Sequence, residues 1–186
     1  TWPSYASKRK YFWDEANAEW TATEVGALIA KLAGTNRKVF VVAHSMGNRI
    51  ALDLLRTWPT QYPGRPIPVE RLIMASPDVD RDWFIRVARQ GLPVPVTLYG
   101  STKDQPLSAS WRSHAHPRAG DLSRWVTGND NGDPYKGVTQ TSLDIVDTSP
   151  VARGLLKHAD FIESPQGAAD LCRVINKKST DDGRLR

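Results

Sequence analysis

The run Val39-Phe40-Val41-Val42-Ala43-His44-Ser45-Met46-Gly47-Asn48-Arg49-Ile50 decides the fold. An unbroken apolar stretch ends in a turn at serine, and a helical pattern follows at once. Strand, sharp turn and helix in this order predict a nucleophile elbow, which lifts a serine hydroxyl above the carboxyl edge of a parallel sheet. The residues two before and two after the serine must be small, and here they are Ala43 and Gly47. The pattern favours Ser45 as a nucleophile over an incidental serine at a buried strand–helix junction.

The helix that begins near Met46 adds a second feature to this turn. Its first N–H groups have no partner within the helix, and they lie at the positive end of the helix dipole. Both would face a negative charge that develops beside Ser45. The N–H of Met46 is therefore predicted to be one donor of an oxyanion hole.

Length and composition are those of an ordinary globular chain. With 186 residues, 40% hydrophobic and 24% charged, the sequence is most simply one domain that buries a real core. No apolar stretch approaches the roughly 20 residues that cross a bilayer, and no secretory signal opens the chain. The chain begins at Thr1 rather than methionine, so we expect it to be cut from a longer protein, and the sequence leaves its compartment open.

The charge pattern and the single cysteine argue against a nucleic-acid-binding protein and against a disulfide-stabilised domain. The net charge of +5 is dispersed, and no zinc-finger spacing or aromatic-and-basic stripe accompanies it, so nucleic-acid binding is not predicted. Cys172 has no partner for an internal disulfide. It falls in an apolar-periodic segment, which favours a buried, inert thiol.

Strand-like runs alternate with helical patterns along the chain. This alternation predicts a parallel sheet that helices cover on both faces. The residues at the carboxyl ends of the expected strands then share one edge, where open α/β sheets bind ligands. The expected strands span 38–43, 72–75, 94–99 and 142–146. The expected helices span about 17–33, 46–58, 83–87, 107–113 and 166–176. The expected edge residues are Ser45, Asp78, Asp104 and His158.

A serine nucleophile needs a general base, and the chain offers four histidines. His158 follows the last expected strand, where hydrolases with the order serine, acid, histidine carry the base. His44 lies inside the elbow, where the side chain usually points away from the serine. His114 and His116 form a His-Ala-His loop that lacks a third metal ligand. His158 is therefore the predicted base, and we predict no metal.

The acid that orients the base is less well determined. Asp104 follows the third expected strand and so shares the edge with the serine. Asp78, one strand earlier, is the alternative acid, and Asp80 is a further candidate. Asp144 and Asp147 are typical of strand ends and turns. We favour Asp104.

Several separate blocks together resemble a bacterial alpha/beta-hydrolase family of unknown function, domain-of-unknown-function family nine hundred. Only the elbow is widely shared with lipases and esterases, so the order of the other blocks makes the resemblance specific. The resemblance implies Ser45, Asp104 and His158 as a catalytic triad. It also implies that the aspartates near residue 80 are a family feature. The matching blocks are 2–4, 43–49, 75–82, 97–101 with Asp104, 117–120, and 144–147 before His158.

The chain departs from the family pattern in one respect. Similar proteins carry an earlier strand that ends in a His-Gly loop, and this loop supplies the second N–H of the oxyanion hole. Because no such segment is present here, we expect residues 1–176 to be the C-terminal part of one alpha/beta-hydrolase domain, followed by a polar tail at 177–186. Losing one oxyanion donor costs about 10²- to 10³-fold in turnover. The chain by itself is thus expected to be weakly active or inactive, with one unpaired edge on the strand before Ser45.

The sequence therefore predicts an alpha/beta-hydrolase fold, three layers with a mostly parallel sheet, that carries a serine hydrolase site. The substrate would be a small-molecule or lipid ester, although amides and thioesters use the same machinery. No cofactor, nucleic acid or transmembrane segment is expected, and the oligomeric state stays open. The alternative is a non-catalytic binding or scaffold domain that keeps the fold.

Overall fold

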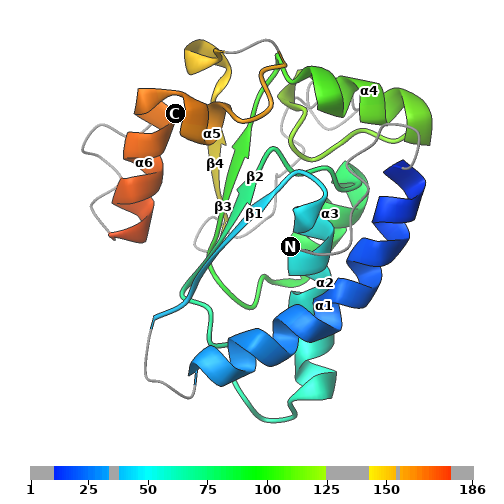
Figure 1. The fold of residues 1–186 in the computed structure, drawn as a ribbon, viewed down its shortest axis with the longest axis vertical. Coiled ribbons are helices and arrows are strands. Elements are labelled where there is room, and N and C mark those ends of the chain that lie inside the picture. The colour runs from blue at the N-terminus through cyan, green and yellow to red at the C-terminus, as the bar shows by residue number, and fades with distance from the viewer. Residues whose placement is uncertain (1–10, 34–37, 125–142, 154–155, 177–186) are drawn as a thin grey trace.

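The computed structural model describes residues 11–33, 38–124, 143–153 and 156–176. Strands and helices alternate along this part of the chain (Figure 1). The strands are β1 (Phe40–His44), β2 (Arg71–Ala75), β3 (Val96–Gly100) and β4 (Leu143–Asp147). The α-helices are α1 (Tyr11–Ala33), α2 (Gly47–Gln61), α3 (Arg81–Gln90), α4 (Gln105–His114), α5 (Asp160–Glu163) and α6 (Pro165–Ile175), and short 3-10 turns are η2 (Leu122–Arg124) and η3 (Ser149–Val151).

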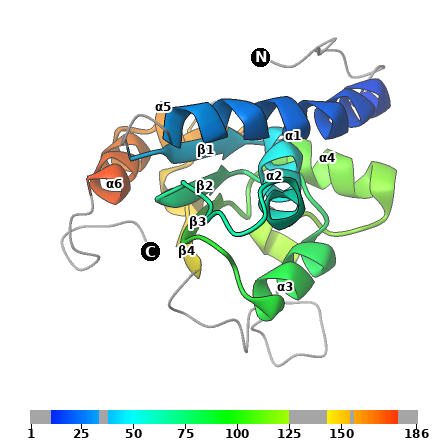
Figure 2. The ribbon, with the colours of Figure 1, turned by 90° about the horizontal axis from the view of Figure 1, so that it is seen from below.

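The four strands form one parallel sheet in the order β1-β2-β3-β4. Figures 1 and 2 show α2 and α3 on one side of this sheet and α5 and α6 on the other. The predicted three-layer α/β architecture is therefore confirmed. Because the strands run in parallel, the segments that follow them all leave from the same edge. That edge carries the candidate site.

Both faces of the sheet are buried, as the apolar strands require. In β2, Leu72 and Met74 belong to the core on the side of α2 and α3. Ile73 and Ala75 point the other way and pack with Phe161 and Val174 of α5 and α6. This alternation follows from the two-residue period of a strand. It explains why the strand sequences read as continuous apolar runs.

The first helix is longer than the sequence suggested. The expected helix spans about 17–33, but α1 already begins at Tyr11. Thr21 lies inside this helix, where its hydroxyl donates to the carbonyl of Asn17 at 2.8 Å. The buried face of α1 includes Ala18 and Ala22 beside α2. Small residues on that face give a weak apolar period, which hid the true start.

Two further local expectations are wrong. The second helix was expected to end near residue 58, yet α2 continues through Pro59 to Gln61. Proline removes only its own N–H, and the N–H of Tyr62 still donates to the carbonyl of Trp58 at 2.8 Å. Cys172 is exposed rather than buried, because it lies on the outer side of α6.

Some predictions fall on residues that the structure does not describe. They are the block at 2–4, the first residue of the expected strand at 142–146 and the polar tail at 177–186. Within the described residues, no helix is long and apolar enough to cross a membrane.

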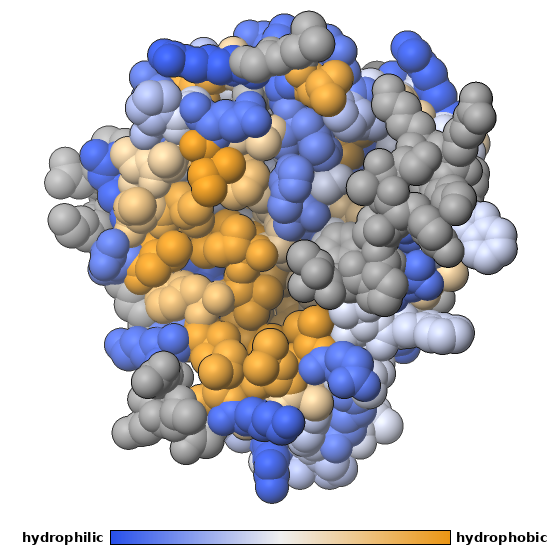
Figure 3. Space-filling view, in the orientation of Figure 1, coloured by the Kyte–Doolittle hydropathy of each residue, from blue (hydrophilic) through white to orange (hydrophobic). Residues whose placement is uncertain are grey.

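Strand β1 lies at the edge of the described sheet. The carbonyl of Val39 accepts from Glu70, and the N–H of Ser45 donates to Ala75, so odd-numbered residues of this segment face β2. Phe40, Val42 and His44 therefore turn their backbone groups outward, where the described residues supply no strand. Val42 is 44% exposed, and Figure 3 shows apolar side chains gathered on this face of the molecule. An uncharged, exposed edge of this kind promotes strand pairing between chains.

The edge strand generates the first prediction. Val42→Lys should lower concentration-dependent self-association, measured by light scattering, because a charge on an edge strand opposes pairing with another chain. Leu28→Lys on α1, where the leucine is 56% exposed, is the matched control because it removes exposed apolar surface away from the strand. An equal effect of both substitutions would assign the association to apolar surface in general rather than to the edge of β1.

Candidate active site

Ser45 occupies the turn between β1 and α2 in a left-handed conformation, with φ of 52°. This region is costly for a residue that is not glycine. Three N–H groups converge on the Ser45 carbonyl and hold it. The backbone of Asn48 donates at 3.2 Å, its side chain at 2.9 Å, and the backbone of Asp78 at 3.2 Å. The local structure thus has the strained turn that the sequence pattern predicts.

The N–H of Met46 follows directly after the serine. Met46 begins the helical conformation, with φ of −61° and ψ of −26°. Within the described residues its N–H donates to no acceptor, as expected at the start of a helix. The residue is buried. An unpaired donor therefore follows Ser45 directly along the backbone.

Asp104 and His158 lie together although 54 residues separate them. Nδ1 of His158 lies 2.8 Å and 2.9 Å from the two carboxylate oxygens of Asp104. A carboxylate only accepts, so Nδ1 carries the hydrogen and Nε2 of a neutral ring is left as an acceptor. Asp104 is also the N-cap of α4, where one oxygen accepts from the backbone of Leu107 at 2.9 Å. Its buried carboxylate is thus fixed by both a helix start and the imidazole.

Ser45 and His158 both lie at the carboxyl edge of the sheet, and His44, the residue before Ser45, contacts His158. No hydrogen bond joins the Ser45 hydroxyl to His158 within the described residues. The link is His44, whose ring centroid lies 4.7 Å from that of His158. Catalytic hydrogen bonds are often loose without substrate, so this arrangement leaves a serine–histidine role open.

Asp78, the alternative acid, lies in a different cluster. Its carboxylate accepts from the hydroxyl of Ser110 at 2.7 Å and pairs with Nε of Arg118 at 3.2 Å. Asp78 is 3% and Arg118 is 2% exposed, so this is a buried ion pair. Asp78 comes from the block at 75–82 and Arg118 from the block at 117–120, both among the blocks that carry the resemblance. The pairing explains why both blocks belong together.

Backbone contacts hold the same two blocks against each other. The N–H of Ala119 donates to Val79 at 3.0 Å, and that of Gly120 donates to Pro77 at 3.1 Å. A Cβ on Gly120 would lie 2.7 Å from the nitrogen of Pro77. Only glycine fits so close an approach.

The remaining aspartates near residue 80 have surface and capping roles. Asp80 is the N-cap of α3 and accepts from the N–H of Trp83 at 2.7 Å. Asp82 forms an exposed ion pair with Arg81 at 2.9 Å.

Asp147, at the end of β4, has the turn role that the sequence predicts. Its carboxylate accepts from the N–H of Ser149 at 2.8 Å.

The other two histidines do not join Ser45. Nε2 of His114 lies 2.8 Å from Glu15, which also pairs with Arg49 at 2.7 Å. His116 is exposed and lies 3.6 Å from Asp80. Among the described residues, no three histidine, cysteine or acidic side chains are grouped so that they could hold a metal ion.

His44 and Asn48 are the site residues that the sequence argument did not single out. His44 was expected to point away from the serine; its Nε2 lies 2.9 Å from the carbonyl oxygen of His158. Partial burial lowers the pKa of His44, and the neighbouring His158 adds to the lowering, against opposing hydrogen-bond and carboxylate effects. The ring is therefore neutral near pH 7. The contact of His44 with His158 and that of Asn48 with Ser45 produce no recognisable pattern in the sequence, although Asn48 belongs to the elbow motif itself.

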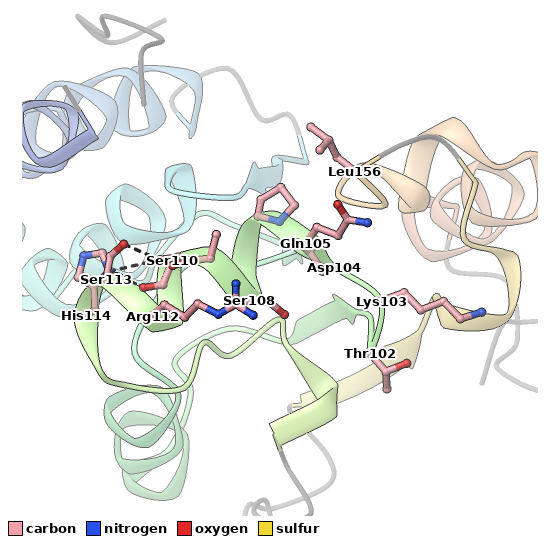
Figure 4. A pocket seen from close by; sticks show the side chains of 12 residues that line it. Thr102, Lys103, Asp104, Gln105, Ser108, Ser110, Arg112, Ser113, His114 and Leu156 are labelled. Carbon is pink, nitrogen blue, oxygen red and sulfur yellow. Dashed lines mark hydrogen bonds between the residues drawn. The ribbon is translucent and has the colours of Figure 1, made fainter. Parts of the chain in front are cut away.

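A pocket of about 840 Å³ runs along α4 beside Asp104 (Figure 4). Its described lining comes from the turn after β3, from the outer side of α4 and from Leu156, two residues before His158. Ala109 is one of the α4 residues that line it, and Arg112 contributes a positive charge. Ser45 is not among the described lining residues, so the pocket reaches the candidate site from the side of Asp104.

The buried ion pair generates the second prediction. Arg118→Met should lower the free energy of unfolding by about 3–5 kcal/mol, because it leaves the carboxylate of Asp78 buried without its cation. Urea unfolding measures this loss. Arg56→Met is the matched control, since Arg56 pairs with Asp53 on the surface, and such pairs contribute less than about 1 kcal/mol. Equal losses in both variants would contradict a structural role for the buried pair.

Comparison with known proteins gives a single result. A family model described as alpha/beta hydrolase of unknown function (DUF900) matches residues 1–176. No curated protein and no solved structure matches the chain. The family match agrees with the parallel sheet and the elbow, and it confirms the resemblance drawn from the sequence blocks. The chain belongs to this alpha/beta-hydrolase family.

Proposed function

We propose that the chain is a serine hydrolase that cleaves carboxylic esters through an acyl-enzyme. One observation carries the proposal: both carboxylate oxygens of Asp104 lie within 2.9 Å of Nδ1 of His158, at the sheet edge where Ser45 occupies the elbow. Serine, acid and histidine follow one another in the order that alpha/beta hydrolases use. The proposal includes no metal and no organic cofactor.

In the proposed mechanism, Ser45 Oγ attacks the ester carbonyl while Nε2 of His158 takes its proton. Asp104 keeps the imidazole in the required tautomer and stabilises its positive charge. The N–H of Met46 donates to the oxyanion that forms on the substrate. His158 then gives the proton to the leaving alcohol. Water repeats the sequence on the acyl-enzyme and releases the acid.

The pocket along α4 is the proposed place for the substrate. Its volume of about 840 Å³ is within the range of small-molecule sites. Pro106, Ala109 and Leu156 supply apolar wall, which suits the hydrocarbon part of a small or lipid ester. We assign this region to the substrate because it borders Asp104 and the segment that carries His158.

A binding or scaffold domain is the alternative function. The exposed face of α1 favours it, because Trp13 is 68% and Trp20 is 83% exposed, and large exposed aromatic side chains often mark contact surfaces. Such a domain would keep the fold without needing a reactive serine. The two proposals therefore differ in whether Ser45 is nucleophilic.

A fluorophosphonate probe provides the third prediction, since its covalent labelling accumulates even where turnover is slow. The chain should be labelled, and Ser45→Ala and His158→Ala should each abolish labelling, because nucleophile and base act as one unit. Labelled protein is measured by intact mass. An unlabelled wild-type chain, or labelling that survives Ser45→Ala, would favour the binding domain.

The two candidate acids can be compared in the same assay. Asp104→Asn should slow labelling by about 10³- to 10⁴-fold, because the amide favours the wrong imidazole tautomer. Asp78→Asn should slow it far less, since Asp78 faces Arg118, although it should lower stability. The reverse order of effects would assign the acid to Asp78.

The pocket supplies the fourth prediction. Ala109→Trp should reduce labelling by a long-chain alkyl fluorophosphonate by roughly tenfold or more while a short-chain probe is little affected, because the indole fills space needed by the chain. Arg86→Trp on the exposed side of α3 is the control for adding a tryptophan. If Ala109→Trp changed the labelling rates of the long-chain and short-chain probes by the same factor, the substrate would bind elsewhere.

A further inference from the structure

His44 makes two kinds of contact with the segment that carries His158. Its Nε2 lies 2.9 Å from the His158 carbonyl oxygen. A carbonyl oxygen only accepts, so Nε2 carries the hydrogen and donates. The two imidazoles also pack with their centroids 4.7 Å apart and their planes at 54°. The last residue of β1 is thus fastened to a segment 114 residues further along the chain.

The His44 ring also packs against a buried aromatic ring. The ring of Phe161 in α5 lies 5.5 Å from it, at an angle of 31°. Phe161 is buried in the core between the sheet and α6. The orientation of the His44 side chain therefore follows from packing, and its donor points at the His158 carbonyl.

The segment that carries His158 has little regular structure to hold it. It lies between η3 and α5, and Lys157 has a left-handed conformation with φ of 53°. Such a conformation costs about 1–3 kcal/mol and persists only where surrounding contacts determine it. Described backbone support comes from Gln105, whose N–H donates to Leu156 at 3.2 Å. The hydrogen bond from His44 supports the next part of the segment, at His158 itself.

We propose that His44 is a positioning residue for the general base, coupling the end of the nucleophile strand to the backbone of His158. Because Ser45 is bonded directly to His44, one hydrogen bond fixes the distance between the serine backbone and the base. Asp104 sets the rotation of the imidazole, and His44 sets the place of the backbone that carries it. The inference rests on the proposed hydrolase function.

The state of the His44 ring suits this role. Partial burial and the nearby His158 favour the neutral form of His44. Because a neutral His44 donates without carrying a charge, it does not repel the positive charge that forms on His158 during catalysis. A permanently charged residue in the same place would repel that charge at close range.

The fifth prediction tests the hydrogen bond with two substitutions. His44→Phe keeps a planar ring but has no donor, whereas His44→Gln places an N–H close to the position of Nε2. His44→Phe should lower the maximal rate of fluorophosphonate labelling by roughly tenfold, as expected for loss of about one hydrogen bond. The probe concentration at half-maximal rate should not change, and His44→Gln should recover most of the rate. A merely structural role would not give this recovery.

Controls separate failure of this inference from failure of the proposed function. His116→Phe makes the same chemical change at an exposed histidine and should label at the wild-type rate. Thermal unfolding verifies that each variant is folded, and His44→Leu is a second variant without a donor should His44→Phe not fold. Labelling that survives Ser45→Ala would refute the hydrolase proposal itself. Two results would overturn the role of His44 while leaving the hydrolase proposal intact. In the first, labelling still depends on Ser45 but keeps the wild-type rate in the donor-free variants. In the second, His44→Gln labels as slowly as the donor-free variants do.

Discussion

The carbonyl group of Ser45 is the constraint on which the candidate site depends. A left-handed serine is unfavourable by itself, and the conformation is held because three N–H groups meet at one oxygen. Two of these come from Asn48 in the first turn of α2, and the third comes from Asp78 after β2. The turn is therefore stable only when β1, β2 and α2 are all in place. The conformation of Ser45 is thus a consequence of sheet assembly rather than of the turn sequence alone.

The same construction appears at the end of the next strand. Ser76 follows β2 with φ of 42°, and its N–H donates to Tyr99 in β3 at 2.9 Å, just as Ser45 donates to Ala75 in β2 at 2.9 Å. Each turn is thus fixed to the last part of the neighbouring strand. The parallel register then brings the N–H of Asp78 to the Ser45 carbonyl, at 3.2 Å. Tyr99 also donates through its hydroxyl to buried Asp170 of α6 at 2.7 Å, so this edge is also joined to the helical layer that contains α6.

The sequence predicted features that depend on a local pattern, and features whose relative position follows from the order of parallel strands. Apolar runs that end in small or polar residues located the strands, and parallel strands bring their carboxyl ends together, which explains why Asp104 and His158 could be paired in advance. Contacts between distant side chains gave no such signal. The Asp78–Arg118 pair and the bond from His44 to His158 depend on how loops cross the edge. The start of α1 was missed for the opposite reason: alanines on its buried face and tryptophans on its exposed face obscure the helical period.

Strain and support coincide around the proposed base. Ser45, Ser76 and Lys157 all have positive φ, and each lies in a segment that leaves or returns to the carboxyl edge. Strained residues persist where several elements determine the backbone together. His158 fits this description: α4 supplies the carboxylate of Asp104 and the N–H of Gln105, and β1 supplies the donor of His44. The position of the imidazole is therefore set by the relative placement of a strand and a helix, because the segment that carries it is too irregular to set it alone.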